Sequence, residues 1–147
     1  MENAQSVNVI GYMNGSTYPD EYVVFSAHAD SWWDGANDDC SGVSGVLELA
    51  RQFSEARSNG TFVNERTLVF CTFGAEESGG PSIWYDWLVG SYEFVCSHPE
   101  IVDGLVLNLN ADMIGNVKTH GPYWLETTME INDFLADAAV DAKIDAC

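Results

Sequence analysis

The pattern of apolar residues predicts an α/β domain with a mixed, mainly parallel sheet. Short, continuous apolar runs have the length and composition of buried strands, and they alternate with stretches whose apolar residues recur at the helical period of about 3.6 residues. Strands that alternate with helices form parallel sheets covered by helices, because each helix packs back on the sheet. The expected order of elements is β-β-α-β-α-β-α, in a chain of 147 residues that is one domain in length.

Four strands are expected, at residues 6–13, 22–27, 67–73 and 103 to about 110. A turn built from Asn-Gly and Pro-Asp separates the first two strands. The second and third are continuous apolar runs, which indicates that they are buried. Cys71 lies inside the third strand and is expected in the core, whereas the spacing of the four cysteines selects no disulfide pair.

A first helix is expected from Gly42 to about residues 58–60. Its apolar positions are Val43, Val46, Leu47, Ala50 and Phe53. Ser41 is a candidate N-cap, because its hydroxyl can accept a hydrogen bond from the first turn. Residues 83–95 are rich in Trp and Tyr and are expected to be partly helical. A last helix is expected where apolar side chains again share one face, namely Ile131, Phe134, Leu135, Ala138 and Ala139.

The charge balance is strongly acidic, with 23 acidic residues against 5 basic ones and a net charge of −18. This charge argues against nucleic-acid binding, which needs cationic side chains to displace counterions from phosphates. The acidic surface could reflect a high-salt habitat or could serve to keep the chain in solution. No apolar run approaches the roughly 20 residues of a membrane span, and no signal segment opens the chain, so a soluble protein is expected.

Residue types that bind metal ions follow three of the expected strands and precede the first helix. In chain order they are His28, Asp30, Asp38–Asp39, Glu76–Glu77 and Asp112. The carboxyl ends of neighbouring parallel strands meet at one edge of a sheet, so these side chains are expected to converge there. Imidazole nitrogen and carboxylate oxygen together suit Zn²⁺.

Each of these residues alone has a structural alternative. His28 could be a hydrogen-bonded structural residue, and Glu76–Glu77 could lie in a solvated turn. Asp38–Asp39 could cap the helix that follows. Asp112 lies in an apolar run, where a charge needs a partner. The joint pattern favours a metal site over the separate alternatives.

Two adjacent tryptophans, Trp32 and Trp33, follow the first of these metal-binding residue types. They are expected to pack at the base of the loop between the second strand and the first helix. Lining of a substrate pocket is the alternative.

Five motifs resemble those of the co-catalytic di-zinc aminopeptidases, a family that also includes glutamate-carboxypeptidase and transferrin-receptor-like proteins. The motifs are NVIG (8–11), HADS (28–31), GANDDCSG (35–42) followed by the helix with LELAR, FGAEESG (73–79) and NLNADMIG (108–115). The resemblance covers about residues 7–115. It implies a three-layer αβα fold of the zinc-exopeptidase, phosphorylase/hydrolase-like type, and a peptidase that releases N-terminal amino acids.

The resemblance also implies metal ligands. His28 and Asp112 would bind one zinc ion, Glu77 would bind the other, and Asp38 would bridge the two. Zinc lowers the pKa of water and polarises the carbonyl group of the peptide bond that is cut.

Two further roles follow from the same resemblance. Asp30 would accept a hydrogen bond from His28 and so fix its ring. Glu76 would be the general base that takes a proton from the attacking water. A peptide or aminoacyl compound would be the substrate.

The family has one more zinc ligand, a histidine well downstream of the NLNADMIG motif. Neither His98 nor His120 has a matching context, although His120 is an alternative ligand. The chain is therefore expected to be a single partial peptidase domain, with residues 116–147 as a loop and a helix. A protease-associated domain could precede it and a C-terminal part could follow it. One zinc site is better supplied with ligands than the other.

Three other functions are compatible with these residues. The chain could be a carboxypeptidase or deacylase of the same family, or a non-catalytic interaction domain on the same fold. It could also be an acidic protein that binds Ca²⁺ or Mg²⁺ without preferring zinc, although His28 argues for a softer metal.

Overall fold

The computed structural model describes residues 5–79, 87–115 and 127–143, which fall into two units divided after Gly115. The first unit holds a four-stranded sheet and three helices among its described residues. The described part of the second unit contains the helix α4 (Asn132–Asp141), which confirms the helix expected near the end of the chain.

The sheet consists of β1 (Val9–Met13), β2 (Tyr18–His28), β3 (Arg66–Phe73) and β4 (Leu105–Asn110). The strands lie in the order β1-β3-β2-β4. Strand β2 is parallel to both of its neighbours, β3 and β4, whereas β1 is antiparallel to β3. The predicted mixed, mainly parallel sheet is confirmed.

Strand β2 begins at Tyr18, four positions before the expected start at residue 22. The early part of the strand is polar, so it lacks the apolar run by which the sequence marks a buried strand. Its pairing comes from the backbone: the Tyr18 amide donates to the Glu65 carbonyl at 2.8 Å. The Arg66 guanidinium also lies 5.0 Å from the centre of the Tyr18 ring, a cation–π distance.

The helices of the first unit are α1 (Cys40–Ser58), α2 (Val89–Ser97) and α3 (Pro99–Asp103). The prediction of Ser41 as N-cap of α1 is wrong: the cap is Asp39, whose carboxylate accepts from the Gly42 amide at 2.8 Å. Helix α2 confirms the helical end of the aromatic-rich segment, whose residues 83–86 lie outside the described part. Helix α3 was not expected, because five residues are too few to display a period. Among the described residues, every helix is too short or too polar to cross a membrane.

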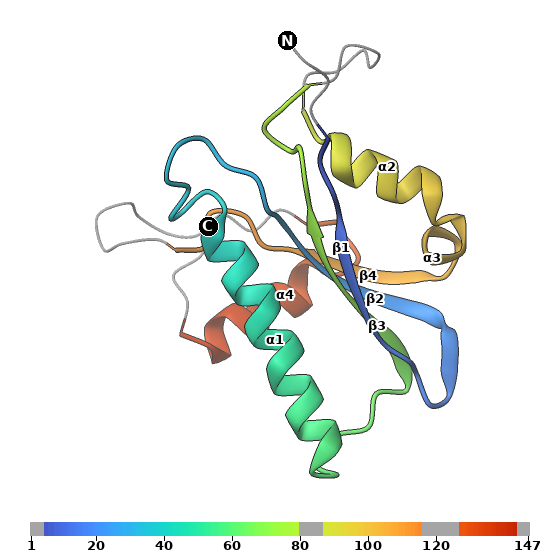
Figure 1. The fold of residues 1–147 in the computed structure, drawn as a ribbon. Helices are drawn as coiled ribbons and strands as arrows, with labels where there is room; N and C mark the ends of the chain where they lie inside the picture. Colours follow the sequence, from blue (N-terminus) through green and yellow to red (C-terminus); the bar gives the residue numbers. More distant parts are fainter. Residues whose placement is uncertain (1–4, 80–86, 116–126, 144–147) are drawn as a thin grey trace. The chain divides into compact units, whose positions relative to one another are not determined.

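The sheet is covered on both sides, which confirms the three-layer αβα architecture (Figure 1). On the α1 side, the Phe25 ring stacks on Phe70 at 5.4 Å and meets Phe53 of α1 at 5.7 Å. On the opposite side, α2 and α3 contribute to a buried cluster made of Val24, Val69, Cys71, Phe94 and Ile101. Successive residues of a strand point to opposite faces, so β2 serves both layers of the core.

Candidate metal centre

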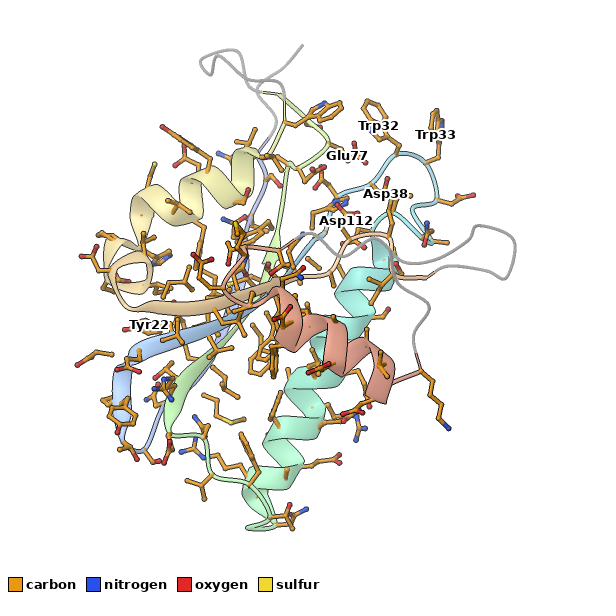
Figure 2. All side chains as sticks on the ribbon, turned by 180° about the vertical axis from the view of Figure 1, so that it is seen from behind. Tyr22, Trp32, Trp33, Asp38, Glu77 and Asp112 are labelled. Atoms are coloured by element: carbon orange, nitrogen blue, oxygen red, sulfur yellow. The ribbon has the colours of Figure 1, made fainter. Side chains whose placement is uncertain are left out.

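The predicted site residues lie at the carboxyl ends of β2, β3 and β4, which are parallel neighbours in the sheet. His28 is the last residue of β2, Glu76 and Glu77 follow β3, and Asp112 follows β4. Figure 2 shows the labelled Asp38, Glu77 and Asp112 gathered at one end of the sheet, with Tyr22 far from them. The expected convergence at one sheet edge is confirmed.

His28 is buried, with 5% of its surface exposed, and its two ring nitrogens have different surroundings. Nδ1 lies 2.9 Å from the main-chain carbonyl oxygen of Asp30. A carbonyl oxygen only accepts, so Nδ1 carries the proton. Nε2 lies 2.9 Å from Oδ1 of Asp38 and 3.8 Å from Oδ1 of Asp112. Two carboxylates thus face this nitrogen, an arrangement that suits a cation or a second ring proton at Nε2.

The electrostatics of the cluster agree with this geometry. Burial acts to lower the pKa of His28, but the surrounding carboxylates, Asp39 first among them, outweigh burial and raise it. Burial also raises the pKa of the Glu76 carboxyl, an effect that His28 opposes. A group of acidic side chains around one imidazole therefore favours a positive charge at this point.

The two adjacent aspartates have separate tasks. Asp39 is 1% exposed, and its Oδ1 accepts from the amides of Gly42 (2.8 Å) and Met113 (3.2 Å). Its Oδ2 accepts from the His28 amide at 3.2 Å. A side chain at Gly42 would collide with this carboxylate. Both oxygens of Asp39 are thus engaged, whereas the partly exposed Asp38 directs its carboxylate at the His28 ring.

Asp30 links the loop after β2 to the loop after β3 by hydrogen bonds. Its carboxylate accepts from the amides of Glu76 (2.8 Å) and Glu77 (3.0 Å). The predicted contact with His28 is made by the main-chain oxygen of Asp30, while the nearer carboxylate oxygen lies 3.7 Å from Nδ1. The carboxylate therefore orients the two glutamates more closely than it orients the histidine.

The prediction that the two tryptophans pack at the base of the loop is wrong. Trp33 is 93% exposed and Trp32 is 57% exposed. Trp33 has a left-handed backbone with φ of 53°, and its ring centre lies 6.0 Å from that of Trp32, so the rings pack on each other. The Trp32 indole N–H donates to Oε2 of Glu77 at 2.6 Å.

Among the residues that the structure describes, the donor atoms form two groups that could each hold a metal ion, with atoms within 4.8 Å of one another. One group is His28, Asp38 and Glu77, and the other is His28, Asp39 and Asp112. The structure thus brings all four predicted ligands together, although the two groups share His28 rather than Asp38. The ligand roles themselves stay predictions, as does that of His120, which lies outside the described residues.

Two features of the site were missed at the sequence level. One is the role of Asp39, whose carboxylate accepts hydrogen bonds from three main-chain amides. The sequence signal for this role is an aspartate directly before a helix. The other is the contact between Trp32 and Glu77, for which the sequence carries no signal, because 45 positions separate the two residues.

Comparison with known proteins identifies a family from the sequence of this chain. A model of Peptidase family M28 matches residues 8–144. The aminopeptidase NAALADL1 of Rattus norvegicus is 38% identical over 94 residues, which are 64% of this chain and 12% of that protein. A glutamate carboxypeptidase 2 homolog of Caenorhabditis elegans is 36% identical over 115 residues, 77% of this chain and 14% of that protein.

Among solved structures, an aminopeptidase from Aneurinibacillus sp. strain AM-1 has a TM-score of 0.62 and 31% identity. The match covers 80% of this chain and 26% of that structure. The chain therefore matches between 12% and 26% of the length of these three proteins.

Proposed function

Because this chain belongs to peptidase family M28, we propose that it contributes the zinc-binding part of an aminopeptidase, which hydrolyses the N-terminal peptide bond of a peptide substrate. The observation that carries the proposal is the arrangement at His28. One ring nitrogen is held by a carbonyl oxygen, and the other faces the carboxylates of Asp38 and Asp112. The similarity to two proteins described as aminopeptidases supports the choice of reaction.

The donor set fits zinc. A histidine whose Nδ1 donates to a carbonyl oxygen presents Nε2 to a metal, which is the usual arrangement around metal-bound histidines. We assign His28, Asp38 and Asp112 to one zinc ion, and Asp38 with Glu77 to a second. Zinc bound at such a site lowers the pKa of water and polarises a carbonyl group.

The residues of the chain have distinct tasks in this proposal. Glu76 accepts the proton of the attacking water as general base. Asp30 fixes the position of Glu76, because its Oδ1 accepts from the Glu76 amide at 2.8 Å. Asp39 holds the end of β2 and the start of α1 together, so that His28 and Asp38 remain opposite each other.

The test is hydrolysis of aminoacyl p-nitroanilides by the zinc-loaded protein that carries this chain. Glu76→Gln should abolish turnover while zinc remains bound, since the amide keeps the shape of the side chain but accepts no proton. Glu93→Gln, on the exposed surface of α2, is the matched control and should be fully active. An active Glu76→Gln variant would remove Glu76 from the role of general base.

A carboxypeptidase is the second candidate, favoured by the 36% identity with the glutamate carboxypeptidase 2 homolog. Substrates blocked at either terminus separate the two reactions, because an aminopeptidase needs a free amino group. A protein that binds zinc and cuts neither kind of substrate would support the non-catalytic interaction domain instead.

A further inference from the structure

A hydrogen bond connects the tryptophan loop to one of the proposed zinc ligands. The indole Nε1–H of Trp32, in the loop after β2, donates to Oε2 of Glu77, in the loop after β3, at 2.6 Å. Figure 2 shows the two side chains next to each other at the end of the sheet that also holds Asp38. The short distance is typical of a hydrogen bond to a charged acceptor.

Residues 30–32 form hydrogen bonds with both the main chain and the side chain of Glu77. The Glu77 amide donates to Oδ2 of Asp30 at 3.0 Å, which fixes the main chain, and Trp32 fixes the carboxylate. A glutamate side chain loses conformational freedom when it binds a metal, and a carboxylate that is already oriented loses less. Residues 30–32 therefore orient the Glu77 carboxylate in the metal-free chain.

The chemistry of the indole suits this task. An indole N–H only donates, so Trp32 cannot take the place of Glu77 as a metal ligand. It also carries no charge, so it orients the carboxylate without neutralising it, as Lys or Arg would. Since a carboxylate has two oxygens, the hydrogen bond to Oε2 leaves Oε1 for a metal ion.

We propose that Trp32 is a positioning residue of the metal centre, which acts by holding the Glu77 carboxylate in the orientation that binds zinc. The inference rests on the metal centre proposed above. Groups that orient metal ligands in this way contribute about 10- to 100-fold to metal affinity.

Trp33 provides a matched control in the same loop. It is the same residue type, lies next in the chain, and is 93% exposed. Its ring contacts the ring of Trp32. Trp33→Phe therefore changes the contact between the two rings about as much as Trp32→Phe does, but it leaves the indole N–H of Trp32 in place.

The experiment measures zinc affinity on the metal-free, 147-residue chain by competition with a chromophoric chelator. Trp32→Phe should raise about tenfold the Kd of the second, weaker zinc-binding event, to which Glu77 contributes, and should leave the tight event at His28, Asp38 and Asp112 unchanged. Trp33→Phe should change either Kd by less than about twofold. In a Glu77→Ala background, Trp32→Phe should have no further effect, because the acceptor of its hydrogen bond is gone. Equal Kd values of the weaker event for Trp32→Phe and the wild type would overturn the inference, as would an undiminished effect in the Glu77→Ala background.

A second measurement does not depend on a Trp32 variant that folds. In the proton NMR spectrum, the indole N–H proton of Trp32 should resonate further downfield in the wild type than in Glu77→Ala, because the variant lacks the acceptor of its hydrogen bond. An unchanged resonance would overturn the inference. A wild-type chain that binds no zinc would overturn the proposed metal centre and this inference with it. A wild-type chain with a single zinc-binding event, or with a weaker event that Trp32→Phe does not change, would overturn the inference alone.

Discussion

Nε2 of His28 lies 2.9 Å from Oδ1 of Asp38, across the junction between the end of β2 and the start of α1. The buried carboxylate of Asp39 holds this junction together by accepting from the amides of His28 and Gly42. The two adjacent aspartates thus have different roles. Asp39 binds main-chain amides, whereas Asp38 faces the His28 ring.

Replacing His28 should remove tight zinc binding. His28→Gln takes away the only nitrogen donor in either candidate ligand group, so the Kd for zinc should rise more than about 100-fold, beyond the effect of losing a residue that merely orients a ligand. Calorimetric titration measures the change. His98→Gln is the control, because His98 lies beside Glu100 at 3.3 Å between α2 and α3. Equal effects of the two substitutions would contradict the assignment of His28.

Asp39→Ala should destabilise the fold whether or not a metal is present. The substitution removes a helix cap and leaves buried amide groups without an acceptor, so the free energy of unfolding should fall by about 2–4 kcal/mol. Urea unfolding of the metal-free chain measures the loss. Ser44→Ala, at an exposed position of α1 whose hydroxyl donates to the Cys40 carbonyl, should cost less than about 0.5 kcal/mol. A similar loss in both variants would contradict the role given to Asp39.

Much of the fold could be predicted because burial and apolar pattern coincide. Strand β3 is an apolar run in the sequence, and four of its eight residues are buried while the other four are half-buried. Helix α1 shows the helical period because one of its sides packs on the sheet. The polar start of β2 and the single turn of α3 could not be predicted, since their hydrogen bonds are made by the backbone, which the sequence does not record.

The candidate site could be predicted as a set of residues, but the task of each residue could not. Asp38 and Asp39 are chemically identical in the sequence. They differ only through the positions of the amides of Gly42, His28 and Met113, which the fold determines. The exposed position of Trp33 could not be predicted either, because an aromatic side chain in a loop is usually expected to pack against the residues around it.

Cys71 should resist thiol reagents until the chain unfolds. Burial raises the pKa of its thiol to about 12, so almost no thiolate is present at pH 8, and the side chain is fully buried. Cys40 and Cys96 are exposed and should react in the native state. Iodoacetamide labelling followed by peptide mass spectrometry, with and without urea, distinguishes the sites. Native labelling of Cys71 at the rate of Cys40 would contradict the core position of β3.

The measurement that tests the central claim most directly is a titration of the metal-free chain with Zn²⁺, repeated with Mg²⁺ and Ca²⁺, under conditions in which the chain is folded. The arrangement of His28, Asp38 and Asp112 predicts one tight zinc-binding event that the two harder cations do not reproduce. Equal and weak binding of all three cations would contradict the claim, because the cluster would then be an acidic surface without a zinc site.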